Sequence, residues 1–268
     1  MTNVVFIHGL WISYTAWQPW IDYFADNGYR GIAPRWPGEA DTAVASRENA
    51  RAQAGFGINQ VTEHFTAVME QFDTPPIAIG HSFGGLVAQK LLGRNHVAAA
   101  IAIDPAPIKG VKPLPLAQLR SAFPVLGNPL NRSRAKALTR SQFRYGFGNA
   151  LTETESDSLW ERWSIPSPGK PLFEAATANF TSKSPAEVDT GNTARGPLLI
   201  TAGTVDHTVP LVTAKAAFRQ YARSTAVTDF HEFDGAGHSL TVDHRWREVA
   251  DVVLSWLIDR GMTGTDVE

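Results

Sequence analysis

The segment Gly80-His81-Ser82-Phe83-Gly84-Gly85 constrains this chain more than any other, because it joins an apolar run (residues 77–79) to an amphipathic one (residues 86–92). A G-x-S-x-G sequence between a buried strand and a helix is typical of a sharp turn that lifts a serine oxygen out of the top of a sheet. Such a turn has no room for side chains next to the serine, which accounts for the flanking glycines. The helix that follows brings unpaired backbone N–H groups and its positive dipole end to the same place.

Short β-rich runs alternate with helix-length segments along most of the chain. This alternation is typical of a mostly parallel sheet covered by helices. We therefore predict the α/β class, with a mostly parallel six-stranded sheet flanked by helices and with candidate ligand loops at the strands' carboxyl ends. The strands are expected at residues 4–7, 31–33, 77–80, 99–103, 197–201 and 226–233, and the helices at residues 15–27, 58–71, 84–94, 211–221 and 244–260.

Residues 105–195 interrupt this alternation, because they contain no clear strand and begin with several prolines. We interpret them as a helical cap inserted after the fourth strand and lying over Ser82, with residues 1–104 and 196–268 forming the core domain. Aromatic side chains are frequent in the cap, and for any one of them attachment of the cap to the core is the simpler role. Together with the first loop they also predict an apolar substrate pocket, lined by Trp11, Phe143, Tyr145, Phe147 and Trp160.

The composition excludes several classes of function. A chain of 268 residues with 43% hydrophobic side chains suits one large globular unit. A net charge of -2 offers no basic excess for nucleic acid, and the absence of cysteine excludes disulfides, thiolate nucleophiles and cysteine-bound metals. No signal peptide is recognisable, and no apolar run approaches the roughly 20 residues of a membrane span. We expect a soluble cytoplasmic protein with no cofactor, no metal and no nucleic-acid or membrane partner, whose oligomeric state the sequence leaves open.

A serine hydroxyl is a weak nucleophile, so it needs a base to take its proton and a group to orient that base. His238 is the best candidate base, because it lies in a glycine-containing loop after the last predicted strand. His207 and His231 are the less favoured alternatives. His81 adjoins the serine, but we expect it to occupy a neighbouring turn position and to face away.

Asp206 is the best candidate for the orienting acid. It follows the fifth predicted strand, and the chain order serine, aspartate, histidine is the order found with a G-x-S-x-G turn. An ionised carboxylate there would hold one imidazole tautomer and stabilise the imidazolium. Asp104, at the end of the fourth predicted strand, is the rival, although its simpler role is to form a turn before Pro105.

The negative charge that develops during attack on a carbonyl needs two backbone N–H donors. One should come from Phe83, the residue after the serine, and the other from the loop after the first strand. Leu10 is the expected donor in that loop, with Trp11 as the second choice. His8 is expected to fix this loop by hydrogen bonding rather than to catalyse.

These pieces together resemble the α/β-hydrolase superfamily over nearly the full chain, cap included. The resemblance implies that Ser82, Asp206 and His238 form a catalytic triad and that Leu10 and Phe83 form an oxyanion hole. The matching segments are residues 5–9, residues 80–85, Asp206 with Val209-Pro210, and residues 235–238.

The short stretch before His8 is similar to the compact plant-type branch of methyl esterases and hydroxynitrile lyases. Lyases of that branch carry a lysine after the catalytic histidine, whereas this chain has Ser239, which disfavours cyanohydrin cleavage. The dehalogenases and epoxide hydrolases of the superfamily need a carboxylate as nucleophile, and this chain has Ser82.

The leading hypothesis is therefore a cofactor-independent serine hydrolase that cleaves a small hydrophobic carboxylic ester, lactone or thioester through an acyl-enzyme at Ser82. The same triad would also serve acyl transfer, perhydrolysis or carbon–carbon bond hydrolysis. A ligand receptor that reuses the fold without chemistry is the third alternative.

Overall fold

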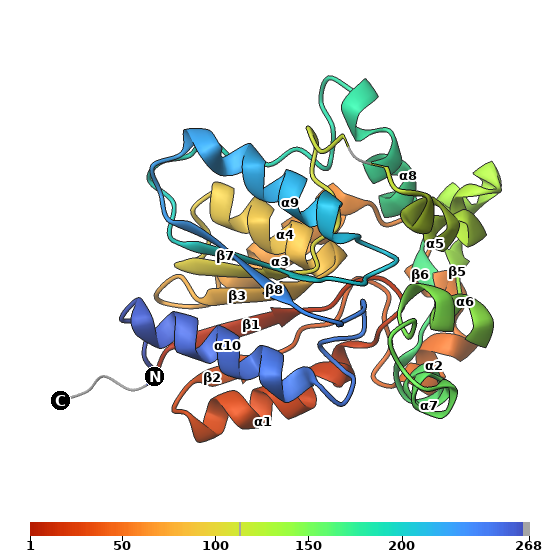
Figure 1. The fold of residues 1–268 in the computed structure, drawn as a ribbon, viewed down its shortest axis with the longest axis horizontal. Coiled ribbons are helices and arrows are strands. Elements are labelled where there is room, and N and C mark those ends of the chain that lie inside the picture. The colour runs from red at the N-terminus through yellow and green to blue at the C-terminus, as the bar shows by residue number, and fades with distance from the viewer. Residues whose placement is uncertain (113, 265–268) are drawn as a thin grey trace.

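The computed structural model describes residues 1–112 and 114–264. A parallel sheet with the strand order β2-β1-β3-β4-β7-β8 runs through the molecule (Figure 1), which confirms the predicted fold class. The four inner strands are buried along almost their whole length, as expected for a sheet covered on both faces. The strands are β1 (Asn3–Ile7), β2 (Arg30–Ile32), β3 (Ile77–His81), β4 (Ala99–Ile103), β7 (Leu198–Gly203) and β8 (Thr228–Phe233).

Helices cover both faces of this sheet (Figure 1). Two of them, α1 (Gln18–Asp26) and α10 (Trp246–Asp259), lie on one face, and their aromatic and aliphatic side chains pack on Phe6 in one core cluster. The opposite face is covered by three others, α3 (Ile58–Met69), α4 (Phe83–Gly93) and α9 (Leu211–Arg219). The predicted helices differ from these by at most three residues at either end, where the terminal turns become 3-10 or irregular.

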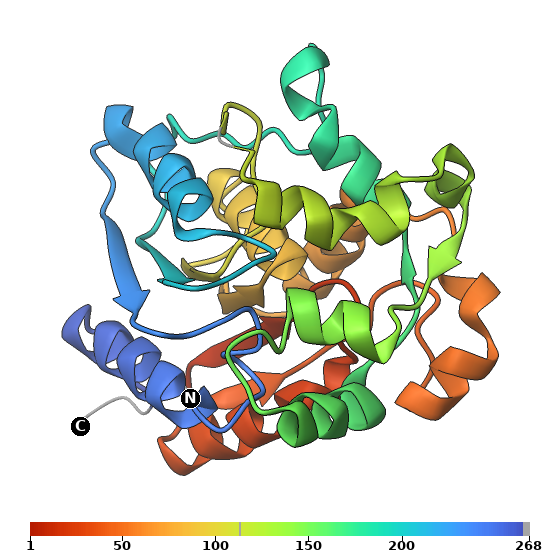
Figure 2. The ribbon, with the colours of Figure 1, turned by 45° about the vertical axis from the view of Figure 1, so that its right-hand side comes forward.

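Most of residues 105–195 lies beyond the carboxyl ends of the strands, on the right of Figure 1 and brought forward in Figure 2. Their last part, however, runs back along α4, where the Lys90 ammonium donates to the carbonyls of Pro185 and Glu187. The helices of this segment are α5 (Leu116–Leu126), α6 (Arg140–Gly146), α7 (Glu153–Trp163) and α8 (Lys170–Ala176). We keep the name cap segment for residues 105–195, and its independence as a unit stays a prediction.

Two details of this end of the molecule were not expected. The cap segment contains an antiparallel pair of two-residue strands, β5 (Ala135–Lys136) and β6 (Ser167–Pro168), where we predicted no clear strand. Pairs this short, one of them with a proline, have no alternating pattern that a sequence can reveal. The short helix α2 (Ala43–Glu48), capped by the Thr42 side chain, has no apolar stripe of helical period and was also missed.

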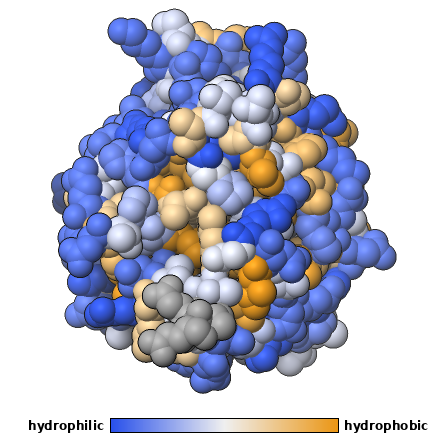
Figure 3. Space-filling view, turned by 90° about the vertical axis from the view of Figure 1, so that its left-hand side faces the viewer, coloured by the Kyte–Doolittle hydropathy of each residue, from blue (hydrophilic) through white to orange (hydrophobic). Residues whose placement is uncertain are grey.

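The face at the amino ends of the strands is mostly hydrophilic, with hydrophobic residues in a central strip (Figure 3). Within residues 1–112 and 114–264, no helix combines the length and the apolar character needed to cross a bilayer.

Candidate active site

Ser82 sits on the sharp turn between β3 and α4 that the sequence predicts. Its φ of 56° lies in the left-handed region, which is unfavourable for a residue with a side chain. The turn leaves no space beside it, because a Cβ atom on Gly80 would lie 2.1 Å from the Gly84 carbonyl oxygen, and one on Gly84 would lie 2.0 Å from that of Ile7. The turn can therefore form only with glycine at positions 80 and 84.

Asp206 and His238 meet at the same end of the sheet. His238 Nδ1 lies 2.6 Å from Asp206 Oδ2, and both side chains are fully buried. The second carboxylate oxygen of Asp206 accepts hydrogen bonds from the backbone N–H of Thr208 at 2.6 Å and of Val209 at 2.8 Å. Three donors on one carboxylate favour its ionised form. The pair therefore fixes His238 in the tautomer or imidazolium form that carries a proton on Nδ1.

The other ring nitrogen of His238, Nε2, is buried and has no hydrogen-bond partner in the described part of the chain. The ring packs edge-on against Phe147, with 4.8 Å between the ring centroids. On another side the ring of His81 lies 4.6 Å away. Since Ser82 directly follows His81, the serine and the free imidazole nitrogen belong to the same small region.

His81 does not face away, as the sequence suggested. It is the last residue of β3 rather than part of the turn, it is 3% exposed, and its ring packs against that of His238. Burial, followed by the charge of His238, holds the pKa of His81 well below its usual value. His81 is thus a neutral packing partner of His238 near neutral pH.

The loop after β1 runs directly against Ser82. A Cβ atom on Gly9 would lie 2.6 Å from Ser82 Cβ and 3.2 Å from its Oγ. The N–H of Leu10 and that of Phe83, the first residue of α4, donate to no acceptor among the described residues. The N–H of Trp11 instead donates to Ser167 Oγ at 2.6 Å. The geometry therefore favours Leu10 over Trp11 as the second donor.

A buried ion pair holds this loop from behind. His8 Nε2 lies 2.9 Å from Glu39 Oε2, His8 Nδ1 lies 2.8 Å from the Gly9 carbonyl oxygen, and the Trp36 indole donates to the His8 carbonyl at 3.0 Å. Burial pushes the pKa of Glu39 up, but the charge of His8 and the hydrogen bonds outweigh it, so this pKa lies below its usual value. His8 occupies the loop-fixing position that the sequence suggested.

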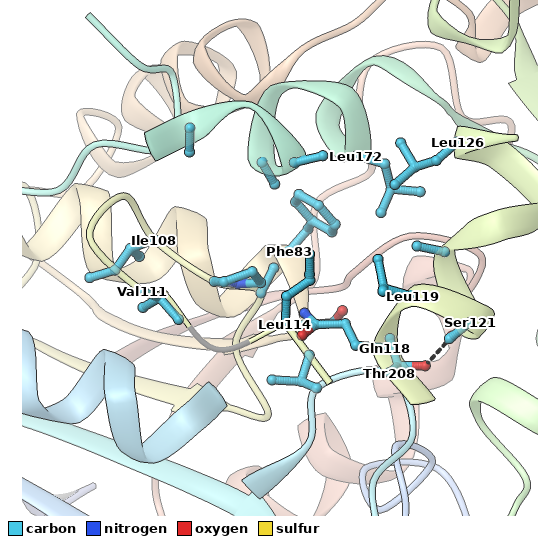
Figure 4. A pocket seen from close by; sticks show the side chains of 18 of the residues that line it. Phe83, Ile108, Val111, Leu114, Gln118, Leu119, Ser121, Leu126, Leu172 and Thr208 are labelled. Atoms are coloured by element: carbon cyan, nitrogen blue, oxygen red, sulfur yellow. Dashed lines mark hydrogen bonds between the residues drawn. The ribbon is translucent and has the colours of Figure 1, made fainter. Parts of the chain in front are cut away.

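A cavity of about 240 Å³ opens beside Ser82 (Figure 4). Most of its lining is aliphatic or alanine, and Lys112 is its one charged residue among those described. Figure 4 shows Phe83 and Leu172 on one side and Gln118 near Thr208 on the other. Much of the apolar lining comes from α5, α8 and the segment after β4, including Ala106, Ile108, Val111, Leu119, Leu126, Leu172, Ala175 and Ala176.

The predicted pocket residues need a correction. Trp11 lines the cavity, but Phe143, Tyr145, Phe147 and Trp160 do not. Phe143 stacks on Phe147, which itself packs against Trp11 and the His238 ring, so both support the site from outside the cavity.

Of the remaining two aromatics, Tyr145 connects the cap segment to the core domain, and Trp160 packs within the cap segment. Tyr145 packs between His207 and Arg120. The Trp160 indole donates to the Leu138 carbonyl, and its ring packs against Arg140. Alanines and leucines line the cavity, and a single sequence does not distinguish them from the many alanines and leucines of the core. The sequence therefore predicted aromatic lining residues instead.

One buried group of metal-ligand type is present among the described residues. His81, Asp104 and His238 each offer one ligand atom, and these atoms lie within 4.8 Å of one another. His238 is the hydrogen-bond partner of Asp206, so the group belongs to the candidate active site.

Residues 4–252 match the family model described as "Alpha/beta hydrolase family". No curated protein matches the chain significantly in sequence. Solved structures show the same fold at low identity. An extracellular alpha/beta-hydrolase from a Paenibacillus species is 19% identical with a TM-score of 0.67, covering 95% of this chain and 98% of that one.

A monoacylglycerol lipase from Paleococcus ferrophilus is 18% identical with a TM-score of 0.66, covering 96% of this chain and 94% of that one. A meta-cleavage product hydrolase from Pseudomonas fluorescens is 17% identical with a TM-score of 0.63, covering 97% of this chain and 92% of that one. At these identities the similarity establishes the fold.

Proposed function

The chain belongs to the alpha/beta hydrolase family, and on this premise we propose that it is a serine hydrolase that cleaves a small hydrophobic carboxylic ester, lactone or thioester. The observation that carries the proposal is the buried 2.6 Å contact between His238 and Asp206, beside a serine held on a turn that tolerates only glycine neighbours. Such an arrangement has an energetic cost that a purely structural role does not require.

In the proposed reaction, Ser82 Oγ attacks the substrate carbonyl while His238 Nε2 takes its proton. His238 then gives this proton to the leaving alcohol or thiol, which leaves an acyl group on Ser82. A water molecule attacks the acyl-enzyme with His238 again acting as base, and the acid is released. Asp206 orients the imidazole and stabilises its charged form throughout.

The N–H groups of Leu10 and Phe83 would hold the negative oxygen that forms in both steps. They come from the loop after β1 and from the start of α4, which Gly9 and Gly84 bring into close contact with the turn. Donors fixed in advance in a dry site stabilise a developing charge far more than water does.

The cavity supports a substrate with an uncharged, apolar acyl or alcohol part. Its lining is mostly aliphatic, and a volume of about 240 Å³ suits a small molecule rather than a polymer. Proteins with the same fold include a monoacylglycerol lipase, a polyneuridine aldehyde esterase and a thioesterase domain. The cytoplasmic location expected from the sequence stays a prediction.

A panel of aryl esters, lactones and thioesters with graded acyl lengths tests this function, run with the wild-type protein and with Ser82→Ala. We expect turnover of short to medium apolar esters, reduced on the order of 10³-fold or more by the substitution. Equal turnover by the two proteins would remove Ser82 as nucleophile. Binding of panel compounds without turnover by the wild type would favour the receptor alternative.

A further inference from the structure

Asp104 is buried in the candidate active site but has no place in the reaction above. It follows β4 with a φ of 41°, it is 0% exposed, and its Oδ1 accepts the backbone N–H of Gly203 at 2.7 Å. Its Oδ2 is buried and finds no donor in the described part of the chain. A simple turn before Pro105 needs none of this burial.

The carboxyl of Asp104 lies close to the Asp206–His238 pair: it offers an oxygen within 4.8 Å of a His238 ring nitrogen, and His238 Nδ1 lies 2.6 Å from Asp206 Oδ2. Two fully buried carboxylates beside the same imidazole strongly disfavour each other's charge, so we expect one of them to carry a proton. Asp206 is bonded by three donors, namely His238 Nδ1 and the N–H groups of Thr208 and Val209. Asp104 has a single donor, the N–H of Gly203. The negative charge is therefore better stabilised on Asp206, and the proton belongs on Asp104.

The electrostatic surroundings agree with this assignment. Burial, and next the charge of Asp206, raise the pKa of Asp104 well above its usual value, and Asp243 acts in the same direction. The other titratable groups nearby are His81, which burial keeps neutral, and His238.

We propose that Asp104 is a positioning residue of the active site: a neutral carboxylic acid whose O–H donates a hydrogen bond to the Asp206 carboxylate and holds it against His238. This role rests on the proposed function of Asp206 and His238. Its donor would fix the orientation of Asp206 in addition to the three donors that Asp206 already has. It would also withdraw some negative charge from Asp206, so the rate of proton transfer at His238 depends on a group that never touches the substrate.

Two substitutions separate this role from the alternatives. Asp104→Ala removes the donor, and we expect the rate of Ser82 modification by a fluorophosphonate to fall about tenfold or more, because Asp206 is less well oriented. Asp104→Asn places an N–H where the O–H was and should recover most of this loss. Asp73→Asn, at an exposed position before β3, is the matched control and should match the wild type.

The pH dependence of the modification rate distinguishes a neutral from an ionised Asp104. If Asp104 is neutral, Asp104→Asn changes no charge and the acid limb of the profile stays in place. If Asp104 is ionised, the same substitution removes a negative charge close to His238 and shifts the acid limb to lower pH by about one unit or more. That shift, or an Asp104→Ala rate equal to that of the wild type, would overturn the proposal.

Infrared difference spectroscopy gives a readout that does not depend on activity. The wild-type protein at neutral pH should show the C=O stretch of one buried protonated carboxyl group, and Asp104→Asn should lack it. If the wild-type protein shows the stretch but its Ser82 does not react with the phosphonate, the proposed function fails while the protonation state of Asp104 holds. If Ser82 reacts and the stretch is absent or survives in Asp104→Asn, the inference about Asp104 fails.

Discussion

Trp11 and Ser167 connect the loop beside Ser82 to the cap segment, because the Trp11 N–H donates to Ser167 Oγ at 2.6 Å. The same loop is bound further by the hydrogen bond from the Ile165 N–H to the Trp11 carbonyl and by the Trp11 indole, which donates to the Lys136 carbonyl. The φ of Trp11 is 66°, a conformation that needs such support. The position of Leu10 therefore depends on residues far away in the sequence.

Ser167→Ala tests this connection. It leaves the buried Trp11 N–H without an acceptor, which costs about 1–3 kcal/mol of stability and loosens the loop that carries the Leu10 N–H. We expect kcat to fall about tenfold while KM changes less, because the Leu10 N–H stabilises the negative oxygen mainly in the transition state. Ser133→Ala, at an exposed position of the same segment, is the control. A loss of stability without any loss of kcat would show that the contact does not orient the oxyanion donor.

Glu39→Gln tests the ion pair behind the same loop. It removes the carboxylate oxygen that lies 2.9 Å from His8 Nε2, and at neutral pH we expect the free energy of unfolding to fall by about 1–3 kcal/mol. The pKa of Glu39 is lowered by folding, so its stabilisation is present above the usual carboxyl pKa and disappears as the pH falls through the folded value.

Denaturant unfolding at several pH values measures this effect. The difference between wild type and Glu39→Gln should be full at neutral pH and shrink in acid below pH about 4.5. The exposed Glu48→Gln serves as control and should differ little from the wild type at any pH. A difference that grows on acidification contradicts the pairing.

Ala175→Leu tests the cavity as the substrate pocket. Ala175 belongs to α8 and lines the cavity, so a larger side chain there reduces its volume. In the ester panel, we expect the preferred acyl chain to become shorter, with a loss in kcat/KM of about tenfold for the longest good substrate. Short esters should be turned over as by the wild type. An unchanged chain-length preference would place the substrate elsewhere.

The parts of the site that depend on local chain geometry were predictable from the sequence. The glycines around Ser82 and the positions of Asp206 and His238 after strands mark features that short segments determine, and the structure brings Asp206 and His238 into contact. The sheet follows from the alternation of apolar runs for the same reason.

The remaining features depend on packing between distant segments. His81 faces His238 because β3 extends one residue further than predicted, and Asp104 is buried because the loops after β7 and β8 close over it. The cavity exists because alanines and leucines from several segments leave an empty volume between them, and no single residue of the sequence predicts such a volume. These features needed the three-dimensional structure.

The most direct test of the central claim is the site and rate of covalent modification by a fluorophosphonate, read by peptide mass mapping in the wild type, His238→Ala and His231→Ala. We predict one adduct, on Ser82, formed on the order of 10³-fold more slowly in His238→Ala and at the wild-type rate in His231→Ala. An adduct on another residue, or a Ser82 adduct formed equally fast without the imidazole of His238, would contradict the account.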